Sequence, residues 1–296
     1  MRIPLDETII GERLVTSSQP WRGVHFLPRT GSTNDRAREL VTRYAADPAG
    51  APDPLWSVVL TDHQTGGRGR LGRAWEVPDR AAISVSAVVP APASGDAAWF
   101  PLLAGLALAR AVAATTAEAG LALTPRLKWP NDVLLADDGD RKVSGILCEL
   151  VPLTDPPSDR RAVVVGTGVN VDQARDELPV PTATSLALAE VTVRREDLVV
   201  AYLTELAALL LEESTGPAGP SAGSGRTADG GRAAYRSACA TVGSEVKVHL
   251  PAGVTVEGWA TGIDDGGRLV VETAAGRQTF AAGDVVHVRR PGGSLA

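Results

Sequence analysis

The sequence predicts an α+β fold in two parts, a large mixed part followed by a small all-β part. Strand-like apolar runs alternate with helical patterns up to residue 213. From about residue 242 the pattern changes to short strands at regular spacing, with glycine-containing turns between them. The composition, 44% hydrophobic and 22% charged residues, is that of an ordinary globular protein and excludes disorder, collagen-like repeats and coiled coils.

The large part is expected to combine short strands with three helices. The first helix, 32–47, can begin at Ser32 or Thr33, because hydroxyl side chains cap helix N-termini. The long apolar stretch 98–119 and the periodic stretch 194–213 predict the other two helices. Strands are expected at 24–28, 56–62, 81–90, 125–130, 132–136, 142–150 and 161–171.

Three regions are expected along the chain: an N-terminal segment 1–23, a large domain 24–241 and a small antiparallel barrel 242–296. Residues 214–231 have the sequence STGPAGPSAGSGRTADGG, which contains too little apolar surface to fold, and they predict a flexible insert in the large domain. The barrel would use strands at 244–250, 254–263, 268–273, 277–283 and 284–289. At about 50 residues it is near the lower limit for independent folding, so we expect it to dock on the large domain.

The chain also carries signals about its compartment. Its first residues, MRIPLDETIIGERL, mix apolar with charged side chains and do not form a secretory signal. The most apolar window, 97–123, contains Arg110 and Glu118 and lacks the ~20 uninterrupted apolar residues of a membrane span. Cys148 and Cys239 form neither a disulfide framework nor a metal-ligand pattern. The sequence therefore predicts a cytoplasmic protein without a membrane partner, and its pI of about 5.3 argues against a nucleic-acid-binding surface.

Residues 63–75, HQTGGRGRLGRAW, concentrate positive charge on a flexible backbone. Glycines allow close approach of a ligand to the main chain, and the forked guanidinium groups of Arg68, Arg70 and Arg73 suit carboxylate or phosphate. The segment is not a Walker A element, because the sequence contains no GKS or GKT. It predicts an anion-binding loop, although a solvated basic loop has the same composition.

Three further clusters carry polar side chains in short patterns. LKWPNDVLL, residues 127–135, supplies Lys128, Asn131 and Asp132. A Pro-Asn-Asp turn between strands, with no role in binding, is an alternative interpretation of the same residues. RKVSGIL places Lys142 at the start of an apolar strand, with Gly145 leaving room beside the backbone. VVVGTGVNV lacks the third glycine of a dinucleotide-binding fingerprint and is a weak Rossmann signal.

Taken in order, these clusters carry a family resemblance. The motifs S-T-N, Q-x-x-G-R-G-R-x-G-R-x-W, K-W-P-N-D, R-K-x-x-G-I-L-x-E and G-x-G-x-N follow one another from about residue 24 onward. In this order the chain resembles the biotin protein ligases. The resemblance implies a mixed-sheet catalytic domain of the biotin/lipoate ligase type, related to class II synthetases, and a small SH3-like C-terminal barrel. It also implies a two-step reaction, in which biotin and Mg-ATP form biotinyl-5′-AMP and a lysine of a carrier protein then takes the biotin.

The resemblance assigns roles to the motif residues. Biotin would be bound by Ser32, Thr33, Asn34, Gln64, Gly67, Arg68, Gly69, Arg70, Lys142 and Gly145. ATP would be bound by Arg70, Gly72, Arg73, Trp75, Lys128, Asn131 and Asn170, with Mg²⁺ held through the ATP phosphates and no metal site of the protein's own. Lys142 and Arg70 would act in the first step, and Asp132 would orient the incoming lysine in the second.

The partner implied by the resemblance is a biotin carboxyl carrier protein or domain of acetyl-CoA carboxylase or a related carboxylase. Fewer than 30 residues precede the catalytic pattern. The winged helix-turn-helix of some family members is therefore not expected, and neither is DNA binding. Two other interpretations stay open: a lipoate or octanoate ligase of the same fold, and a non-catalytic binding module built on it.

Overall fold

The computed structural model describes residues 2–91, 96–153, 160–215, 230–250 and 253–287. Its centre is a seven-stranded sheet with the order β1-β2-β5-β9-β8-β7-β6. The strands are β1 (Gly23–Thr30), β2 (Ser57–Gln64), β5 (Ala82–Pro90), β6 (Pro125–Lys128), β7 (Asp132–Leu135), β8 (Arg141–Pro152) and β9 (Arg161–Asn170). Only β1 and β2 pair in parallel, and the other neighbours are antiparallel, which confirms the expected mixed sheet.

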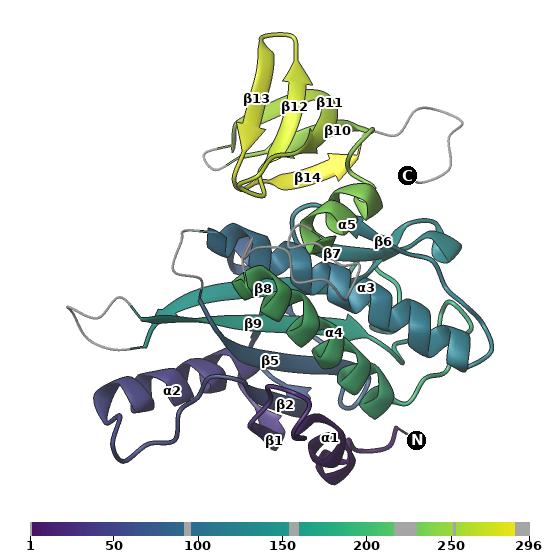
Figure 1. Cartoon of the computed structure of the whole chain (residues 1–296). Coiled ribbons are helices and arrows are strands. Elements are labelled where there is room, and N and C mark those ends of the chain that lie inside the picture. The colour runs from purple at the N-terminus through teal and green to yellow at the C-terminus, as the bar shows by residue number, and fades with distance from the viewer. Residues whose placement is uncertain (1, 92–95, 154–159, 216–229, 251–252, 288–296) are drawn as a thin grey trace, which may run out of the picture.

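Helices cover both faces of this sheet (Figure 1). On one face lies α2 (Thr33–Ala46), the crossover that a parallel β1–β2 pair requires, with Ala37 and Val41 fully buried against the strands. On the other face lie α3 (Phe100–Glu118) and α4 (Arg195–Thr215), which pack against each other over the larger core. The sheet is therefore buried between two helical layers.

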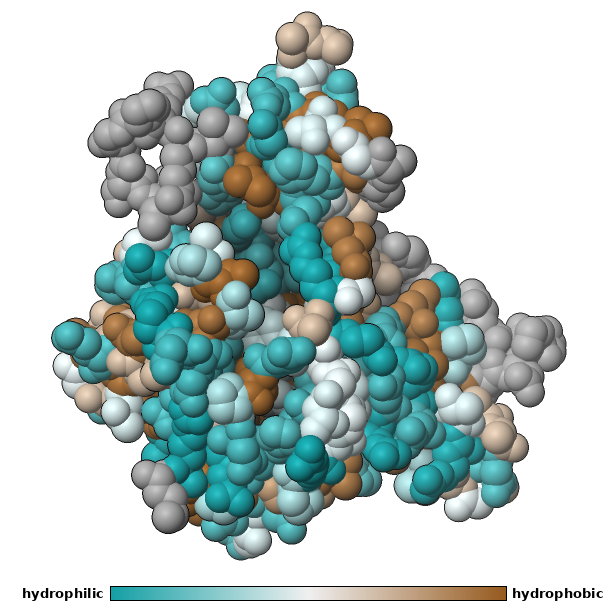
Figure 2. All heavy atoms as spheres, turned by 180° about the vertical axis from the view of Figure 1, so that it is seen from behind, coloured by the Kyte–Doolittle hydropathy of each residue, from teal (hydrophilic) through white to brown (hydrophobic). Residues whose placement is uncertain are grey.

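The segment Ala97–Glu118, which contains α3, is long and apolar enough to cross a membrane, but 67% of its most apolar window is buried. Because it packs on all sides, nearly every position can be apolar, as is usual for a core helix. On the face of the molecule shown in Figure 2, hydrophobic side chains lie in separate patches among hydrophilic ones.

Two helices were not predicted. The first, α1 (Glu7–Leu14), is capped by the Asp6 carboxylate, which accepts from the amides of Thr8 and Ile9. The second, α5 (Gly230–Ala238), begins inside the region expected to be an insert, while α4 extends into its start, so both ends of 214–231 are helical. Residues 216–229 of that region lie outside the described residues, and the expected flexibility stays a prediction.

The C-terminal part forms a five-stranded antiparallel sheet with the order β13-β12-β11-β10-β14. Its strands are β10 (Glu245–His249), β11 (Thr255–Ile263), β12 (Leu269–Thr273), β13 (Gly276–Phe280) and β14 (Asp284–His287). The small sheet docks on the large part as expected, because the indole nitrogens of Trp99 and Trp129 donate to the carbonyls of Asp265 (2.7 Å) and Gly267 (3.0 Å) in the β11–β12 turn. The domain boundaries given above stay predictions.

Candidate active site

Glycines in the centre of the sheet open a cavity on the face covered by α2. Side chains alternate along β9, and those on this face begin with Ala162 and Val164, which pack beneath α2. The next positions on the same face are Gly166 and Gly168, whose missing side chains leave space. The result is a cavity of about 600 Å³ whose floor crosses several strands.

The register of the sheet places Ser84 and four motif residues in one row across this floor. From β5 to β6, the neighbours are Ser84, Gly168, Gly145, Asp132 and Lys128. Three motifs that are separate in the sequence meet in this row, because antiparallel pairing aligns Lys128 and Asp132 of K-W-P-N-D with Gly145 and Gly168 of the two later motifs. All five residues line the cavity.

The N-terminus of α2 forms one end of the cavity. Ser32 is the N-cap residue, but its side chain makes no capping hydrogen bond; Gln64 Oε1 instead accepts from the backbone amide of Thr33 at 2.9 Å. Asn34 Nδ2 donates to Glu149 Oε1 at 3.0 Å, and its Oδ1 lies 2.7 Å from Ser86 Oγ. A Cβ atom on Gly166 would collide with the Asn34 amide, so the glycine makes this arrangement possible.

The arginine-rich loop folds as a small hairpin of β3 (Gly67–Arg68) and β4 (Ala74–Trp75). Its tip has left-handed backbone at Leu71 (φ 58°) and Gly72 (φ 72°). Gly67 packs against the Trp75 carbonyl and the Gln64 side chain, which leaves no room for a Cβ atom. Among the expected ligand-binding residues, only Gly67 and Gly72 do not line the cavity, because the hairpin needs them for its own geometry.

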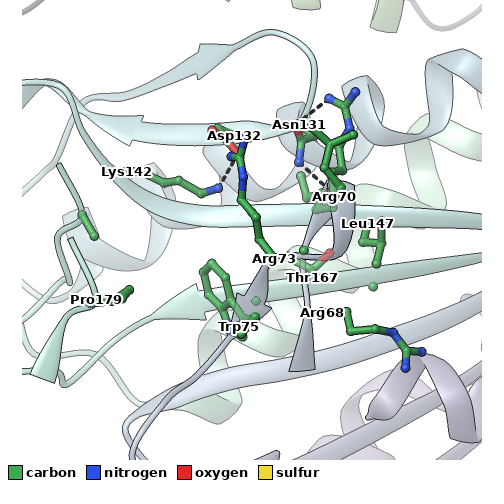
Figure 3. A pocket seen from close by; sticks show the side chains of 18 of the residues that line it. Arg68, Arg70, Arg73, Trp75, Asn131, Asp132, Lys142, Leu147, Thr167 and Pro179 are labelled. Atoms are coloured by element: carbon green, nitrogen blue, oxygen red, sulfur yellow. Dashed lines mark hydrogen bonds and ion pairs between the residues drawn. The ribbon is translucent and has the colours of Figure 1, made fainter. Parts of the chain in front are cut away.

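Each arginine of the loop is held by a different wall of the cavity. Arg68 pairs with Asp35 of α2, and Arg73 pairs with Asp284 of β14. Arg70 Nη1 donates to Asn131 Oδ1 at 3.1 Å, in the turn between β6 and β7 (Figure 3).

These contacts shift the acidities of the groups involved. Burial lowers the pKa of Arg70 below its ordinary value, because it disfavours the charged guanidinium. Burial also opposes ionisation of Asp284, but the hydrogen bond and charge of Arg73, helped by Lys128 and Arg70, outweigh it and hold the pKa below 3.8. The pKa of Asp35 is lowered in the same way, since Arg68 and Arg38 outweigh its burial.

The centre of the cavity holds an ion pair and an indole. Lys142 Nζ lies 2.6 Å from Asp132 Oδ1 and 5.8 Å from the centre of the Trp75 ring (Figure 3). The indole rests on Gly168, where a Cβ atom would lie 2.5 Å from it. Among the described residues no acceptor reaches the buried Trp75 Nε1, so a ligand acceptor at this position would satisfy it.

Two parts of the wall were missed by the sequence analysis. One is the segment Pro179–Ala183, and the other is Gly283–His287, which includes β14 of the small sheet. Asn170 is in the wall as expected, but its amide is occupied within the protein, donating to the Thr184 carbonyl at 2.9 Å and accepting from Gln173 at 2.8 Å. Within the described ranges, no group of three or more His, Cys, Asp or Glu side chains is placed to hold a metal ion.

Comparisons with known proteins agree with this architecture. Residues 50–170 match the model of the biotin/lipoate A/B protein ligase family, and residues 241–288 match the biotin protein ligase C terminal domain. The chain is 38% identical to a biotin--[acetyl-CoA-carboxylase] ligase of Mycobacterium tuberculosis over 98% of both chains. It is 31% identical to the enzyme of that name from Paracoccus denitrificans, over 88% of this chain and 98% of that protein.

A solved structure has the same fold. It is the biotin protein ligase from Aquifex aeolicus in complex with biotin and ATP, with a TM-score of 0.69 and 24% identity over 91% of this chain and all of that one. At this identity the likeness concerns the fold, which combines the mixed sheet with the small C-terminal sheet.

Proposed function

Because this chain belongs to the biotin protein ligase family, we propose that it uses ATP to join biotin to a lysine of a carrier protein. The observation that carries the proposal is the cavity, in which Lys142 and three arginines face a floor of glycines. Such a site suits a reaction that brings together a carboxylate and a triphosphate, since both are anions. The 38% identity to a biotin--[acetyl-CoA-carboxylase] ligase over nearly the whole length of both chains supports biotin as the substrate.

Biotin would lie against the end of the cavity formed by α2. Its ureido group needs both donors and acceptors, and Ser32, Thr33 and Gln64 present hydroxyl and amide groups there. The Asn34 amide covers Gly166 and the Trp75 indole covers Gly168, so these two side chains would face its rings, and Arg68 flanks the opening. The carboxylate would then point toward Lys142.

In the first step an oxygen of the biotin carboxylate attacks the α-phosphorus of ATP, a new P–O bond forms, and the bond to pyrophosphate breaks. Negative charge builds up between the two substrates, and donors already in place stabilise it without reorganisation. Lys142 and Arg70 would supply these donors, with Arg73 and Lys128 facing the remaining phosphates. The buried Trp75 N–H would find its acceptor on the bound nucleotide.

Magnesium would bind mainly through the ATP phosphates. The described residues offer no cluster of three acidic or histidine ligands, whereas Mg²⁺ in nucleotide sites commonly uses one or two carboxylates together with phosphates and water. Asp284, which lines the cavity and pairs with Arg73, is a carboxylate that could approach such an ion. When bound, the ion would offset charge on the departing pyrophosphate.

In the second step the amine of the carrier lysine attacks the mixed anhydride and AMP leaves. An exposed lysine is almost wholly protonated at neutral pH, so a base has to receive its proton. Asp132 is suited to this role once Lys142 has turned to the substrate oxygens. The carrier would be a biotin carboxyl carrier protein or domain, and the cytoplasmic location and lack of nucleic-acid and membrane partners stay predictions.

Pyrophosphate–ATP exchange tests the proposal. The purified protein and Mg²⁺ would be incubated with biotin, lipoate or octanoate in separate reactions without a carrier. We expect exchange with biotin. Exchange only with lipoate or octanoate would keep the chemistry and change the substrate, and absence of exchange with all three acids would favour the binding module.

A further inference from the structure

We propose that Arg2 is a positioning residue for the nucleotide end of the cavity, a role that rests on the proposed function. Residues 2–6 form an extended strap across the outside of the large sheet. Residues 172–184 follow β9, and their second half lines the cavity. We call the first stretch the strap and the second the wall segment. The strap holds the wall segment, which in turn holds Lys142.

Arg2 uses all three nitrogens of its guanidinium on the wall segment. Nε donates to Asp172 Oδ2 at 3.0 Å, and Nη2 donates to the Asp172 carbonyl at 2.6 Å. Nη1 donates to Glu177 Oε1 at 3.1 Å, and Nη2 also pairs with Glu177 Oε2. Forked contacts of this kind fix the direction as well as the distance of the bound group. The turn from Asp172 to Glu177 is thereby tied to one side chain of the strap.

The wall segment reaches the reaction centre at its other end. The Lys142 backbone amide donates to the Thr182 carbonyl at 2.8 Å, and the Thr184 amide donates to the Lys142 carbonyl at 2.8 Å. Asn170, which the family resemblance assigns to ATP, donates to the Thr184 carbonyl at 2.9 Å. A displacement of this segment would therefore move the backbone of Lys142 and one wall of the nucleotide end together.

A buried ion pair of the core anchors the strap. Arg195 and Asp62 form a buried ion pair at 2.9 Å, with side chains 8% and 4% exposed. Arg195 Nη2 also donates to the Ile3 carbonyl at 2.5 Å, and Asp62 Oδ1 accepts from the Leu5 amide at 3.1 Å. Because Asp62 lies in β2 and Arg195 begins α4, the strap is fixed to two elements of the core.

Electrostatics give Arg2 a second effect. The first half of the wall segment carries Asp172, Asp176 and Glu177, and it leads into the wall of a site proposed to bind a triphosphate. Arg2 pairs with two of these carboxylates and offsets one of their negative charges. The hydrogen bond from Arg2 holds the pKa of Glu177 below its ordinary value of 4.5, so the pair stays ionised at neutral pH.

The test compares Arg2→Ala, Arg2→Lys and a control, Arg13→Ala. Arg13 is a matched control because it belongs to the same N-terminal region and pairs with Asp197 of α4, away from the wall segment. In pyrophosphate exchange we expect Arg2→Ala to raise KM for ATP by about three- to tenfold. KM for biotin should rise by less, because biotin meets the displaced region only through Lys142, whereas the wall segment lines the nucleotide end. Arg2→Lys should lie between, because an ammonium keeps the charge and loses the fork.

A second readout does not depend on activity. Trypsin can cleave after Arg175 in the wall segment, so faster cleavage there in Arg2→Ala, measured by mass spectrometry, reports a loosened wall segment. Cleavage in Arg2→Lys should again lie between wild type and Arg2→Ala, and Arg13→Ala should be cleaved there at the wild-type rate. If wild type shows no exchange, the proposed function fails while the cleavage assay still tests the strap.

Three results would overturn the role of Arg2. The first is Arg2→Ala with wild-type KM for ATP. The second is wild-type cleavage at Arg175 in Arg2→Ala. The third is an equal change in Arg13→Ala, or an equal rise of both KM values, which would mean a general loss of structure.

Discussion

Lys142 Nζ and Asp132 Oδ1 lie 2.6 Å apart across neighbouring strands, with side chains 33% and 18% exposed. The two groups proposed to serve successive steps are thus partners in this structure. When substrate oxygens draw Lys142 away, the Asp132 carboxylate is released beside the newly formed anhydride. The pair would prevent Asp132 from engaging a carrier lysine before the adenylate exists.

Replacing Asp132 with asparagine should separate the two steps. We expect transfer from preformed biotinyl-5′-AMP to a carrier to slow by about 10²–10⁴-fold, because the proton acceptor is lost. Pyrophosphate exchange should change much less. Single-turnover transfer measured beside exchange decides the point, and Asp140→Asn is a control, since Asp140 lines the same cavity but pairs with Arg126. Transfer at the wild-type rate would exclude the role of Asp132.

Lys142→Ala should act on the first step. Removing a preorganised donor to developing charge costs about 10²–10³-fold in rate, and we expect a loss of this size in pyrophosphate exchange. Lys142→Arg should rescue little, because Gly145 and Trp75 enclose the ammonium closely and the guanidinium is larger. Exchange kinetics with saturating biotin and ATP provide the measurement, and full activity of either variant would contradict the assignment.

Local sequence patterns predicted the long helices and the strands of the large sheet. The helices 98–119 and 194–213 and the strands of the large sheet were found because long periodic or apolar runs dominate their neighbourhoods. The eight-residue helix α1 was missed, since it buries only Ile10 and Leu14 and so leaves a weak pattern. Expected strand 125–130 stops at Lys128, where the Trp129-Pro130 turn begins.

The candidate site shows the same difference between features that local sequence predicts and features that depend on tertiary packing. Most motif residues line the cavity, because sheet register brings three motifs into one row and the start of α2 and the β3–β4 hairpin bring the other two, while their ligand roles stay predictions. Gly67 and Gly72 lie outside the cavity lining, and their expected contacts with biotin and ATP stay predictions, because sequence alone does not separate a glycine needed by a hairpin from one that faces a ligand. The contribution of Asp284 and its neighbours depends on how the two sheets dock, which no local pattern records.

The glycine floor can be tested by Gly168→Ala. The added Cβ atom would lie 2.5 Å from the Trp75 indole, so the ring has to leave the floor. We expect a loss of at least about tenfold in pyrophosphate exchange, and overpacking to lower the free energy of unfolding by about 1–3 kcal/mol. Gly11→Ala is the control: nothing lies within 4 Å of its Cβ position in α1, and it should be neutral or slightly stabilising. Wild-type exchange in Gly168→Ala would disprove the packing argument.

The Arg73–Asp284 pair should make a pH-dependent contribution to stability. Its carboxylate has a pKa below 3.8 in the folded protein, so the contribution is fully present above that value and is lost as pH falls below it. We expect Asp284→Asn to lower the free energy of unfolding by at most about 1 kcal/mol near neutral pH, because the pair is partly exposed. Urea unfolding of both proteins between pH 3 and about pH 7 should show this difference shrinking at the acidic end. A difference that grows toward acid would contradict the assignment.

The arginine-rich loop should become less accessible when substrate binds. Its arginines are held by Asp35, Asn131 and Asp284, and the adenylate would add contacts to the same side chains. Tryptic cleavage after Arg68, Arg70 or Arg73 should therefore slow in the presence of biotin and Mg-ATP. Mass spectrometry of the fragments measures it, and equal rates with and without ligands would argue against closure over the substrate.

The cavity depends on both ends of the described chain, because the strap at Arg2 holds the wall segment and β14 supplies part of the lining. A ribosome delivers these residues in order, and the large sheet can pair as soon as β9 has emerged. The wall containing Asp284 cannot exist until the last strand has been made. A growing chain would therefore acquire its core first and its capacity to handle reactive adenylate last, so that prematurely terminated chains would fold in part without a complete site.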